Sequence, residues 1–408
     1  MEKLYVNFMP QYADAPVSLW LLKKHVDEAA KAAVEAVAAG TQLRLLLPAG
    51  ASETAAELTA AIDAAGTSAR VVKGSDPDNE AEAAPADVIV TLNRADFGFV
   101  YTNDRAAARV FTGDKPIPAH HNGEVTYDGK VAPKLVSGEA WLRAAGIVAG
   151  EGTYVSIVSP DGAYAEPVEL AAGATGADVV AAAKLPEDAE VKALYLGFPT
   201  SVFVPAAKLS EPLDLSAGCD AIRVYTTKNC MAAAMDRIAQ GWRNESCGHC
   251  VFGHEGSWQI ATIFGDIVNK RGQGNDLETL GNLCPVMAKN TICDVDATLA
   301  RTTQQAIELF GDEIKAHYSG AKTCPSGECA AYKTYHILVS KCVGCGECLK
   351  ACDDDAILGK ADFVHVINQA KCTQCGQCRE ACKYGAVVRA GAKKPKTPPR
   401  PIPCRVHA

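Results

Sequence analysis

The sequence predicts a multidomain protein of class α/β plus α, and three observations support this. Strand-like and helix-like patterns alternate over residues 1–150, and short strand-like runs follow over residues 151–208. All 17 cysteines lie beyond residue 218. Alternating strands and helices are typical of an α/β layer domain with at least some parallel strands. A chain of 408 residues is long enough to bury several hydrophobic cores.

Composition places the chain among ordinary globular proteins. It is 48% hydrophobic and 22% charged, with a formal net charge of −8. The negative charge excludes the sequence-wide positive field of a nucleic-acid-binding protein. No apolar run of 18 or more residues is present to span a membrane, and residues 1–15 show no signal-peptide pattern. We therefore expect a cytoplasmic protein with no membrane span and no nucleic-acid partner.

The α/β layer domain is expected over residues 1–150. Its helix candidates are Ser18–Ala39 and Glu53–Ala65. Its strand candidates are short apolar runs at Lys3–Met9, Gln42–Leu47, Ala69–Lys73 and Val88–Leu92. The order of these patterns along the chain is what favours parallel strands joined by helices.

A β-grasp-like module is expected over residues 151–208 and a four-helix bundle over residues 209–333. The module has one helix, Ala177–Ala183, and strands at Tyr154–Val158, Ala163–Val168 and Val191–Leu196. The bundle helices are predicted at Met231–Gln240, Gly256–Asn269, Asp276–Met287 and Asp296–Tyr318. A cysteine-dense α+β domain over 334–390 precedes a basic, proline-rich tail, 391–408, which we expect to be extended, lying on a partner or solvated.

The cysteine-dense domain contains an internal repeat. Cys342-x2-Cys345-x2-Cys348-x3-Cys352 recurs as Cys372-x2-Cys375-x2-Cys378-x3-Cys382. In a reducing compartment clustered cysteines indicate metal ligands, and this spacing is typical of two-cluster ferredoxins. Zinc sites use separate CxxC pairs, which disfavours a pair of zinc knuckles.

In the two-cluster ferredoxin arrangement the fourth cysteine of each run binds the other cluster. The spacing therefore predicts two [4Fe–4S] clusters with crossed ligand sets. The first set is Cys342, Cys345, Cys348 and Cys382, and the second is Cys372, Cys375, Cys378 and Cys352.

A second motif lies between two of the predicted helices. Residues 245–258 read Glu-Ser-Cys-Gly-His-Cys-Val-Phe-Gly-His-Glu-Gly-Ser-Trp, and Thr291-Ile292-Cys293 follows later. This resembles the cluster-binding domain of the NADH-binding flavoprotein subunits of respiratory complex I, bifurcating [FeFe]-hydrogenases and NAD-dependent formate dehydrogenases. Their pattern is E-S-C-G-x-C-x-x-C-x-E-G with a later fourth cysteine.

The resemblance extends over most of the chain. Residues 151–208 resemble that family's soluble-ligand-binding (SLBB) β-grasp module, and residues 334–390 resemble the two-cluster extension of its hydrogenase-type members. Residues 3–7 resemble a strand of its flavin domain. The resemblance also implies a structural zinc site of the Cys₃His type, formed by Cys230, His317, Cys324 and Cys329. The alternative for these residues is buried thiols without a metal.

The motif departs from the family at its third cysteine, which is replaced by Gly253. Cys247, Cys250 and Cys293 remain, and either His254 or Cys284 would complete a third iron–sulfur cluster. The alternatives are a three-cysteine cluster, a zinc ion or a site that has lost its metal. Cys219 and Cys404 fit no ligand pattern, and we interpret both as ordinary thiols.

The flavin-site signatures of the family are also absent. No segment matches its glycine-rich G-R-G-G-A-G-F-P loop, and residues 7–14 and 95–107 replace its other two flavin-site stretches. Without a glycine-rich turn that opens a helix, no backbone nest for a phosphate is expected. We therefore expect FMN to be absent, and the alternative is a divergent pocket that still binds FMN.

These patterns predict an iron–sulfur electron-transfer subunit of a multisubunit oxidoreductase. It would have no catalytic residues of its own and would relay single electrons between partner redox centres. The resemblance implies a thioredoxin-like [2Fe–2S] subunit and a catalytic subunit as partners, and ferredoxin is a further candidate. The alternatives are an NADH dehydrogenase subunit that retains FMN, and a scaffold held by metals without a redox role.

Overall fold

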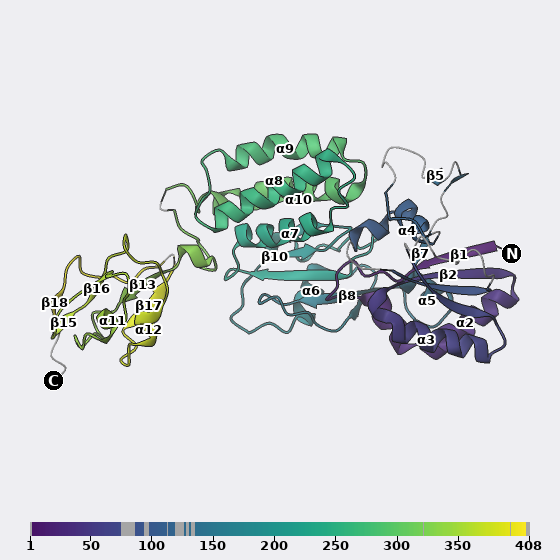
Figure 1. The fold of residues 1–408 in the computed structure, drawn as a ribbon, viewed down its shortest axis with the longest axis horizontal. Coiled ribbons are helices and arrows are strands. Elements are labelled where there is room, and N and C mark those ends of the chain that lie inside the picture. Colours follow the sequence, from purple (N-terminus) through teal and green to yellow (C-terminus); the bar gives the residue numbers. More distant parts are fainter. Residues whose placement is uncertain are drawn as a thin grey trace. The chain divides into compact units, whose positions relative to one another are not determined.

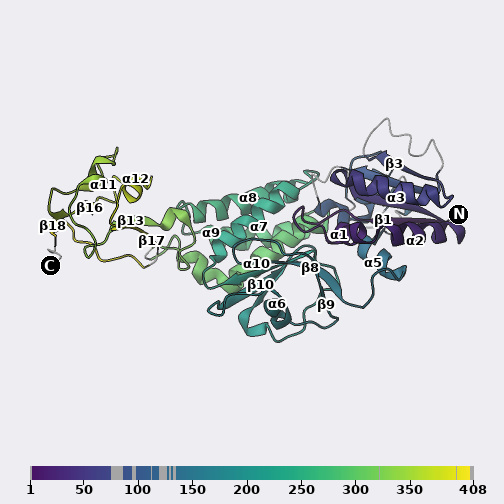
Figure 2. The same cartoon turned by 90° about the horizontal axis from the view of Figure 1, so that it is seen from below.

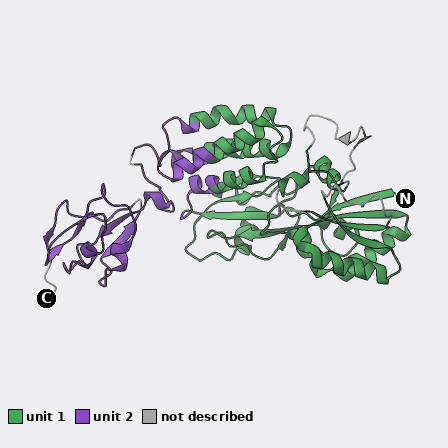
Figure 3. Cartoon of the chain, viewed as in Figure 1, with its two compact units in different colours: residues 1–227, 237–261, 278–309 green, residues 228–236, 262–277, 310–408 purple. Residues whose placement is uncertain are grey.

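The structure is a computed structural model that describes residues 2–74, 86–93, 98–111, 113–118, 126–127, 130–131, 135–320, 322–391 and 393–404. The chain divides into two compact units (Figure 3). Unit 1 comprises residues 1–227, 237–261 and 278–309, and unit 2 comprises residues 228–236, 262–277 and 310–408. Among the described residues, no helix is both long and apolar enough to cross a membrane.

Unit 1 begins with a five-stranded, fully parallel sheet of order β3-β4-β2-β1-β7. The strands are β1 (Glu2–Asn7), β2 (Thr41–Pro48), β3 (Ala69–Lys73), β4 (Val88–Asn93) and β7 (Leu135–Ser137). β2 ends in a buried apolar run, as expected for a central parallel strand covered on both faces. The structure thus confirms the parallel sheet predicted from the alternating pattern.

Four helices lie beside this sheet (Figures 1 and 2): α1 (Val17–Lys24), α2 (Val26–Ala38), α3 (Ser52–Ala64) and α5 (Gly138–Ala144). They share one hydrophobic core with it. The single helix expected over residues 18–39 is two helices, because the backbone of His25 leaves the helical region at φ −131°. This break lets both helices direct apolar side chains into the same core. The remaining elements here are η1 (Ala49–Ala51), η2 (Phe99–Thr102), α4 (Asp104–Val110), β5 (Thr126–Tyr127) and β6 (Lys130–Val131).

A second, mixed sheet follows in unit 1, with strand order β11-β10-β12-β8-β9. Its elements are β8 (Thr153–Val158), β9 (Val168–Leu170), α6 (Gly176–Ala182), β10 (Val191–Leu196), β11 (Val202–Pro205), η3 (Ala206–Lys208) and β12 (Ala221–Thr226). β12 lies between β10 and β8, so the sheet continues past residue 208, where the sequence pattern ended the module. β12 is central in the sheet but comes last in the sequence of the module, so short-range patterns could not assign it.

Four helices follow: α7 (Met231–Glu245), α8 (Val251–Val268), α9 (Asp276–Asn290) and α10 (Asp294–Lys315). Each of them is divided between the two units. Within unit 1, the indole of Trp242 on α7 donates to the carbonyl of Val295 on α10 at 2.8 Å. Gly256 on α8 gives close approach to α9, since a Cβ there would lie 2.7 Å from the sulfur of Met287.

The C-terminal part of unit 2 is built from two similar halves. Its elements are η4 (Ala330–Tyr332), β13 (Thr334–Ile337), α11 (Glu347–Lys350), β14 (Ile357–Leu358), β15 (Phe363–Val364), β16 (Val366–Ile367), α12 (Gln377–Glu380), β17 (Val387–Ala390) and β18 (Ile402–Pro403). β13 pairs with β17, β14 with β16 and β15 with β18, all antiparallel. The tail therefore returns to its own domain, through the β15–β18 pairing.

Candidate metal centres

Two small cavities in unit 2 are each lined by four cysteines. Cys342, Cys345, Cys348 and Cys382 line one cavity. Cys352, Cys372, Cys375 and Cys378 line the other. Each cavity thus takes three cysteines from one run and the fourth from the other, which is the geometry that the crossed sets require.

Backbone groups approach the sulfur atoms in both halves in the same way. The N–H of Ala356 donates to the sulfur of Cys352 at 3.4 Å, and that of Ala386 donates to the sulfur of Cys382 at 3.3 Å. Such N–H···S bonds stabilise the more negative, reduced form of an iron–sulfur cluster. Gly344 has a φ of +73°, which favours glycine. It also allows the backbone to approach closely, since a Cβ there would lie 2.7 Å from the backbone nitrogens of Asp362 and Phe363.

Most of the cysteines of these cavities are shielded from water. Cys345 and Cys375 are exposed, and the other six are buried or half-buried. Burial, together with neighbouring thiols, raises the pKa of Cys348 to about 12 and that of Cys378 to about 11. Iron binds the thiolate form, so loading of the cavities must displace these protons.

The tail brings one cysteine to the first cavity that the sequence pattern did not assign. The backbone N–H of Cys404, just after β18, donates to the carbonyl of Asp362 at 2.8 Å. Its side chain packs with the cysteine core, and burial and the contact with Cys342 raise the pKa of its thiol. Cys404 is therefore not an isolated surface thiol, and nothing in its sequence spacing could have indicated this contact.

Unit 2 also brings Cys230, His317, Cys324 and Cys329 together. One ligand atom from each lies within 4.8 Å of all the others, and all four residues are buried. The Nε2 atom of His317 is 3.3 Å from the sulfur of Cys230 and 3.6 Å from that of Cys329. Three sulfurs and one nitrogen at this spacing suit a single tetrahedral zinc ion.

The surroundings of His317 prepare it to bind a metal through Nε2. Its Nδ1 atom is 3.0 Å from the carbonyl oxygen of Glu313 and can donate to it, as metal-binding histidines commonly do. Burial alone would lower the pKa of His317, but hydrogen bonds to Cys230 and Cys324 outweigh it and raise that pKa to about 10. Hydrogen bonds from Cys230 and Cys329 lower the pKa of Cys324. Hydrogen bonding to Cys324 and burial raise the pKa of Cys230 and that of Cys329. Of the three thiols, Cys324 is therefore the one that favours the thiolate form.

A third group of cysteines lies in two interhelical connections of unit 1. Cys247 and Cys250 connect α7 to α8, and Cys293 precedes α10. Burial raises the pKa of Cys293 to about 12, and the charges of Cys247 and Cys250 act in the same direction. Of the two expected fourth ligands, His254 is exposed on the first turn of α8. Cys284 is fully buried on α9, where its polar neighbour is Thr303.

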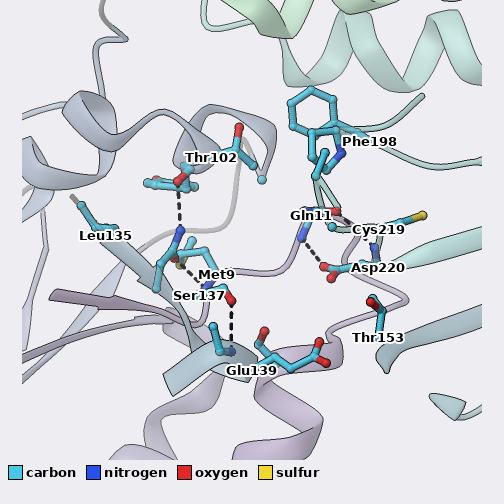
Figure 4. Close-up of a pocket in the computed structure, with 18 of the residues that line it drawn as sticks. Met9, Gln11, Thr102, Leu135, Ser137, Glu139, Thr153, Phe198, Cys219 and Asp220 are labelled. Carbon is cyan, nitrogen blue, oxygen red and sulfur yellow. Dashed lines mark hydrogen bonds between the residues drawn. The ribbon is translucent and has the colours of Figure 1, made fainter. Parts of the chain in front are cut away.

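Unit 1 contains a cavity of about 780 Å³ (Figure 4). It opens at the C-terminal ends of β1 and β7, where Asn7 and Ser137 are paired in register. Ligands of parallel α/β sheets commonly bind at such strand ends. In Figure 4, Gln11 and Asp220 face each other, and the backbone N–H of Gln11 donates to the Asp220 carboxylate at 3.0 Å. Cys293 also lines the cavity.

The lining of this cavity is acidic. Two arginines line it, and each pairs with a carboxylate. The Nη2 atom of Arg143 lies 3.0 Å from Oε1 of Glu139 and 3.1 Å from Oε1 of Glu169. The Nη2 atom of Arg301 lies 3.6 Å from Oδ1 of Asp294. Burial raises the pKa of Asp220 to about 7. The described lining thus offers no arginine without a carboxylate for a phosphate group.

Two family models match the chain. Residues 233–317 match the NADH-ubiquinone oxidoreductase-F iron–sulfur binding region, and residues 341–386 match a 4Fe-4S dicluster domain. The chain therefore contains two segments that are similar to iron–sulfur binding regions, one of them from NADH-ubiquinone oxidoreductase subunits. This confirms the resemblance found from the cysteine motifs, and it places iron–sulfur binding regions on the helical segment and on the C-terminal repeat.

Curated relatives of this iron–sulfur chain include subunits of two enzymes. The HndC subunit of the NADP-reducing hydrogenase of Solidesulfovibrio fructosivorans is 25% identical over 235 residues, which cover 55% of this chain and 48% of that subunit. The F 2 subunit of the NADH-quinone oxidoreductase of Rhizobium meliloti (strain 1021) is 26% identical over 202 residues, covering 47% and 48%. The chain therefore spans about half the length of the curated relatives it matches.

A solved structure shares the fold. A crystal structure of an NAD⁺-reducing [NiFe]-hydrogenase in the H₂-reduced state superposes with a TM-score of 0.62 at 20% identity, covering 78% of this chain and 56% of that one. At this identity the likeness is evidence for the fold alone. It supports a mixed α/β fold with a parallel sheet and a ferredoxin-like domain.

Proposed function

We propose that the chain is an electron-transfer subunit of an oxidoreductase complex. The observation that carries the proposal is the pair of four-cysteine cavities within the 4Fe-4S dicluster domain. Cys342, Cys345, Cys348 and Cys382 hold one [4Fe–4S] cluster, and Cys352, Cys372, Cys375 and Cys378 hold the other. When bound, such clusters supply one-electron redox chemistry. The protein buries or half-buries six of the eight ligand cysteines and directs backbone N–H groups at two of their sulfurs.

We assign a third iron–sulfur cluster to Cys247, Cys250 and Cys293. Its support is the match of residues 233–317 to an iron–sulfur binding region. Because Cys293 lines the large cavity of unit 1, this cluster would lie beside that cavity.

We assign zinc to Cys230, His317, Cys324 and Cys329. A buried, closed Cys₃His set leaves no open position for a substrate, so its role is structural. Cys230 precedes α7, His317 follows α10, and the other two ligands come later in the chain. The ion therefore fastens these segments of unit 2 to one another.

We propose that the unit 1 cavity does not hold FMN, because its described lining is acidic and both of its arginines are paired with carboxylates. The second candidate function, NADH oxidation through FMN, is favoured by the volume of the cavity, which lies within the range of cofactor sites. It is also favoured by the position of Cys293 in the lining.

The partners we propose follow from this role. An electron relay needs a donor and an acceptor, and a thioredoxin-like [2Fe–2S] subunit, a catalytic subunit and ferredoxin are the candidates. The relatives are named as subunits of a hydrogenase and of a quinone oxidoreductase, which supports assembly with other chains.

Metal and flavin content of the full chain, purified without oxygen, tests the function. We expect about eight to twelve irons and about one zinc per chain, no flavin, and a reduced-state EPR signal from iron–sulfur clusters. Stoichiometric flavin released on denaturation would support the second candidate. Zinc without iron would contradict electron transfer and leave a structural scaffold.

A further inference from the structure

The place of the missing third cysteine is filled by a carboxylate from another helix. A Cβ built on Gly253, in the first turn of α8, would lie 2.3 Å from Oδ2 of Asp296 and 2.8 Å from the sulfur of Cys250. Asp296 stands in the first turn of α10, three residues after Cys293. Its carboxylate therefore occupies the volume into which a side chain at position 253 would project.

The environment of Asp296 is unusual for a carboxylate. The residue is only 3% exposed. Its Oδ1 atom has no hydrogen-bond partner, and its Oδ2 atom receives only a long hydrogen bond, 3.4 Å, from Ser246. A buried carboxylate in this state is costly unless another group satisfies it, and a metal ion is one such group.

We propose that Asp296 is the fourth ligand of the third iron–sulfur cluster, together with Cys247, Cys250 and Cys293. This inference rests on the proposed function and deepens it. The carboxylate takes the coordination position that the relatives' third cysteine holds. Gly253 is required at its position because any side chain there would displace the Asp296 carboxylate.

Other groups nearby fit this position less well. His254 is exposed, whereas Asp296 is buried beside Cys250. Asp294 shares the first turn of α10 with Asp296, but its side chain is 70% exposed and pairs with Arg301. An acidic residue in the first turn of α10 can thus remain exposed, so stabilisation of the helix N-terminus does not account for the burial of Asp296. Asp294 therefore supplies a matched control.

The ligand spacing of a single ion differs from that of a cubane cluster. Within the described residues, the Cys₃His set is the only one that gathers its ligand atoms within 4.8 Å. Cubane ligands stand farther apart than the ligands of one tetrahedral ion.

A carboxylate is a harder ligand than a thiolate and holds cluster iron less firmly. The iron bound to Asp296 is therefore the one we expect to leave first. With ferricyanide as the oxidant, [4Fe–4S]²⁺ gives [3Fe–4S]⁺ and Fe²⁺, and the electron passes to ferricyanide. One electron from added dithionite then reduces [3Fe–4S]⁺ to [3Fe–4S]⁰, and addition of Fe²⁺ restores [4Fe–4S]²⁺.

The test uses the full chain, purified without oxygen, and three variants: Asp296→Ala, Asp294→Ala and Gly253→Cys combined with Asp296→Ala. Iron content and EPR spectra are measured before and after mild ferricyanide oxidation. We expect about twelve irons in the wild type and a [3Fe–4S] signal after oxidation. Asp296→Ala should lose between one and four irons, and Asp294→Ala should lose none. The double variant should regain about twelve irons and resist conversion, because a cysteine replaces the carboxylate.

Rescue by a cysteine placed on the opposite helix distinguishes a ligand from a merely structural residue. The inference is overturned if Asp296→Ala keeps its iron content and wild-type spectra, or if the double variant regains no iron. A wild-type content of about eight irons overturns the inference but leaves the two-cluster relay intact. Absence of iron overturns both.

Discussion

At the scale of single residues, burial does not by itself make a cysteine a metal ligand. Cys219 and Cys324 are both buried, at 3% and 0% exposure. The thiol of Cys219 donates to the carbonyl of Ala221 at 3.0 Å, while Cys324 belongs to a set of four converging ligand atoms. The difference lies in the neighbours that the fold provides.

Cys324→Ser should therefore remove the zinc. We expect a loss of about one zinc per chain and a thermal midpoint of unit 2 lower by roughly 10 °C, the shift that about 3 kcal/mol gives in a domain of this size. Elemental analysis and loss of cluster absorbance on heating measure these effects. Cys219→Ser is the control, and equal zinc loss in both variants would refute the assignment.

The crossed ligand sets make a second prediction at this scale. Cys352→Ala should destroy the cluster whose other ligands are Cys372, Cys375 and Cys378, and spare the cluster bound within its own run. We expect a loss of about four irons and of one of the two ferredoxin-type EPR signals. Cys404→Ala, which removes a nearby cysteine that lines neither cavity, should retain both clusters. Retained iron in Cys352→Ala would contradict the crossed arrangement.

At the scale of elements, tight turns shape the cysteine loops. Gly344 and Gly346 both have positive φ angles, +73° and +79°. A Cβ at position 344 would press on the backbone nitrogens of Asp362 and Phe363, whereas a Cβ at position 346 meets nothing within 4 Å. The two glycines therefore share a conformational requirement and differ in close packing.

Gly344→Ala should be more damaging than Gly346→Ala. Replacing a left-handed glycine costs about 1 kcal/mol, and the backbone clash at position 344 adds strain of roughly 1–3 kcal/mol. Anaerobic thermal bleaching of the brown clusters compares the two variants. Equal midpoints would show that the close approach at Gly344 carries no energetic weight.

At the scale of the whole molecule, two half-buried carboxyl groups make the stability of unit 1 depend on pH. Glu245 at the end of α7 accepts the backbone N–H of Phe99 at 3.2 Å, and Asp220 accepts that of Gln11. Burial raises the pKa of Glu245 to about 7 and that of Asp220 to about 7. Both carboxyl groups therefore bind their protons more tightly in the folded chain than in the unfolded chain.

The stability of unit 1 should thus fall as the pH rises. The folded state binds more protons than the unfolded state between the ordinary pKa values of 4.5 and 3.8 and the raised value of about 7. The stability that these two groups contribute is fully present below their ordinary pKa values and is lost as the pH approaches about 7. Glu245→Gln should flatten this dependence by on the order of 1 kcal/mol.

All four tryptophans lie in unit 1, so tryptophan fluorescence follows its unfolding selectively. Denaturant titrations at about pH 5.5 and 7 compare the wild type with Glu245→Gln. Glu57→Gln, at an exposed position of α3, removes one acid without touching the half-buried Glu245. A Glu245→Gln variant with the wild-type slope would contradict the role of Glu245.

Much of the molecule could be predicted from local patterns. The parallel sheet follows from alternating strands and helices, and the iron–sulfur binding regions follow from cysteine spacings, because both signals lie within short stretches of chain. Three features could not be predicted: the helix break at His25, the central position of β12, and the pairing of the tail with β15. Each depends on packing or pairing between segments far apart in the sequence.

The sequence by itself determined the identity and spacing of the cysteines, and with them the type of metal chemistry to expect, because ligands within one loop are placed by the loop's own geometry. Only the tertiary structure decided which residues meet across helices and strands. Asp296 opposite Gly253 and Cys404 beside Cys342 are the examples. A side chain that reaches a site from another element leaves no periodic trace in the chain, since its position depends on how the elements pack.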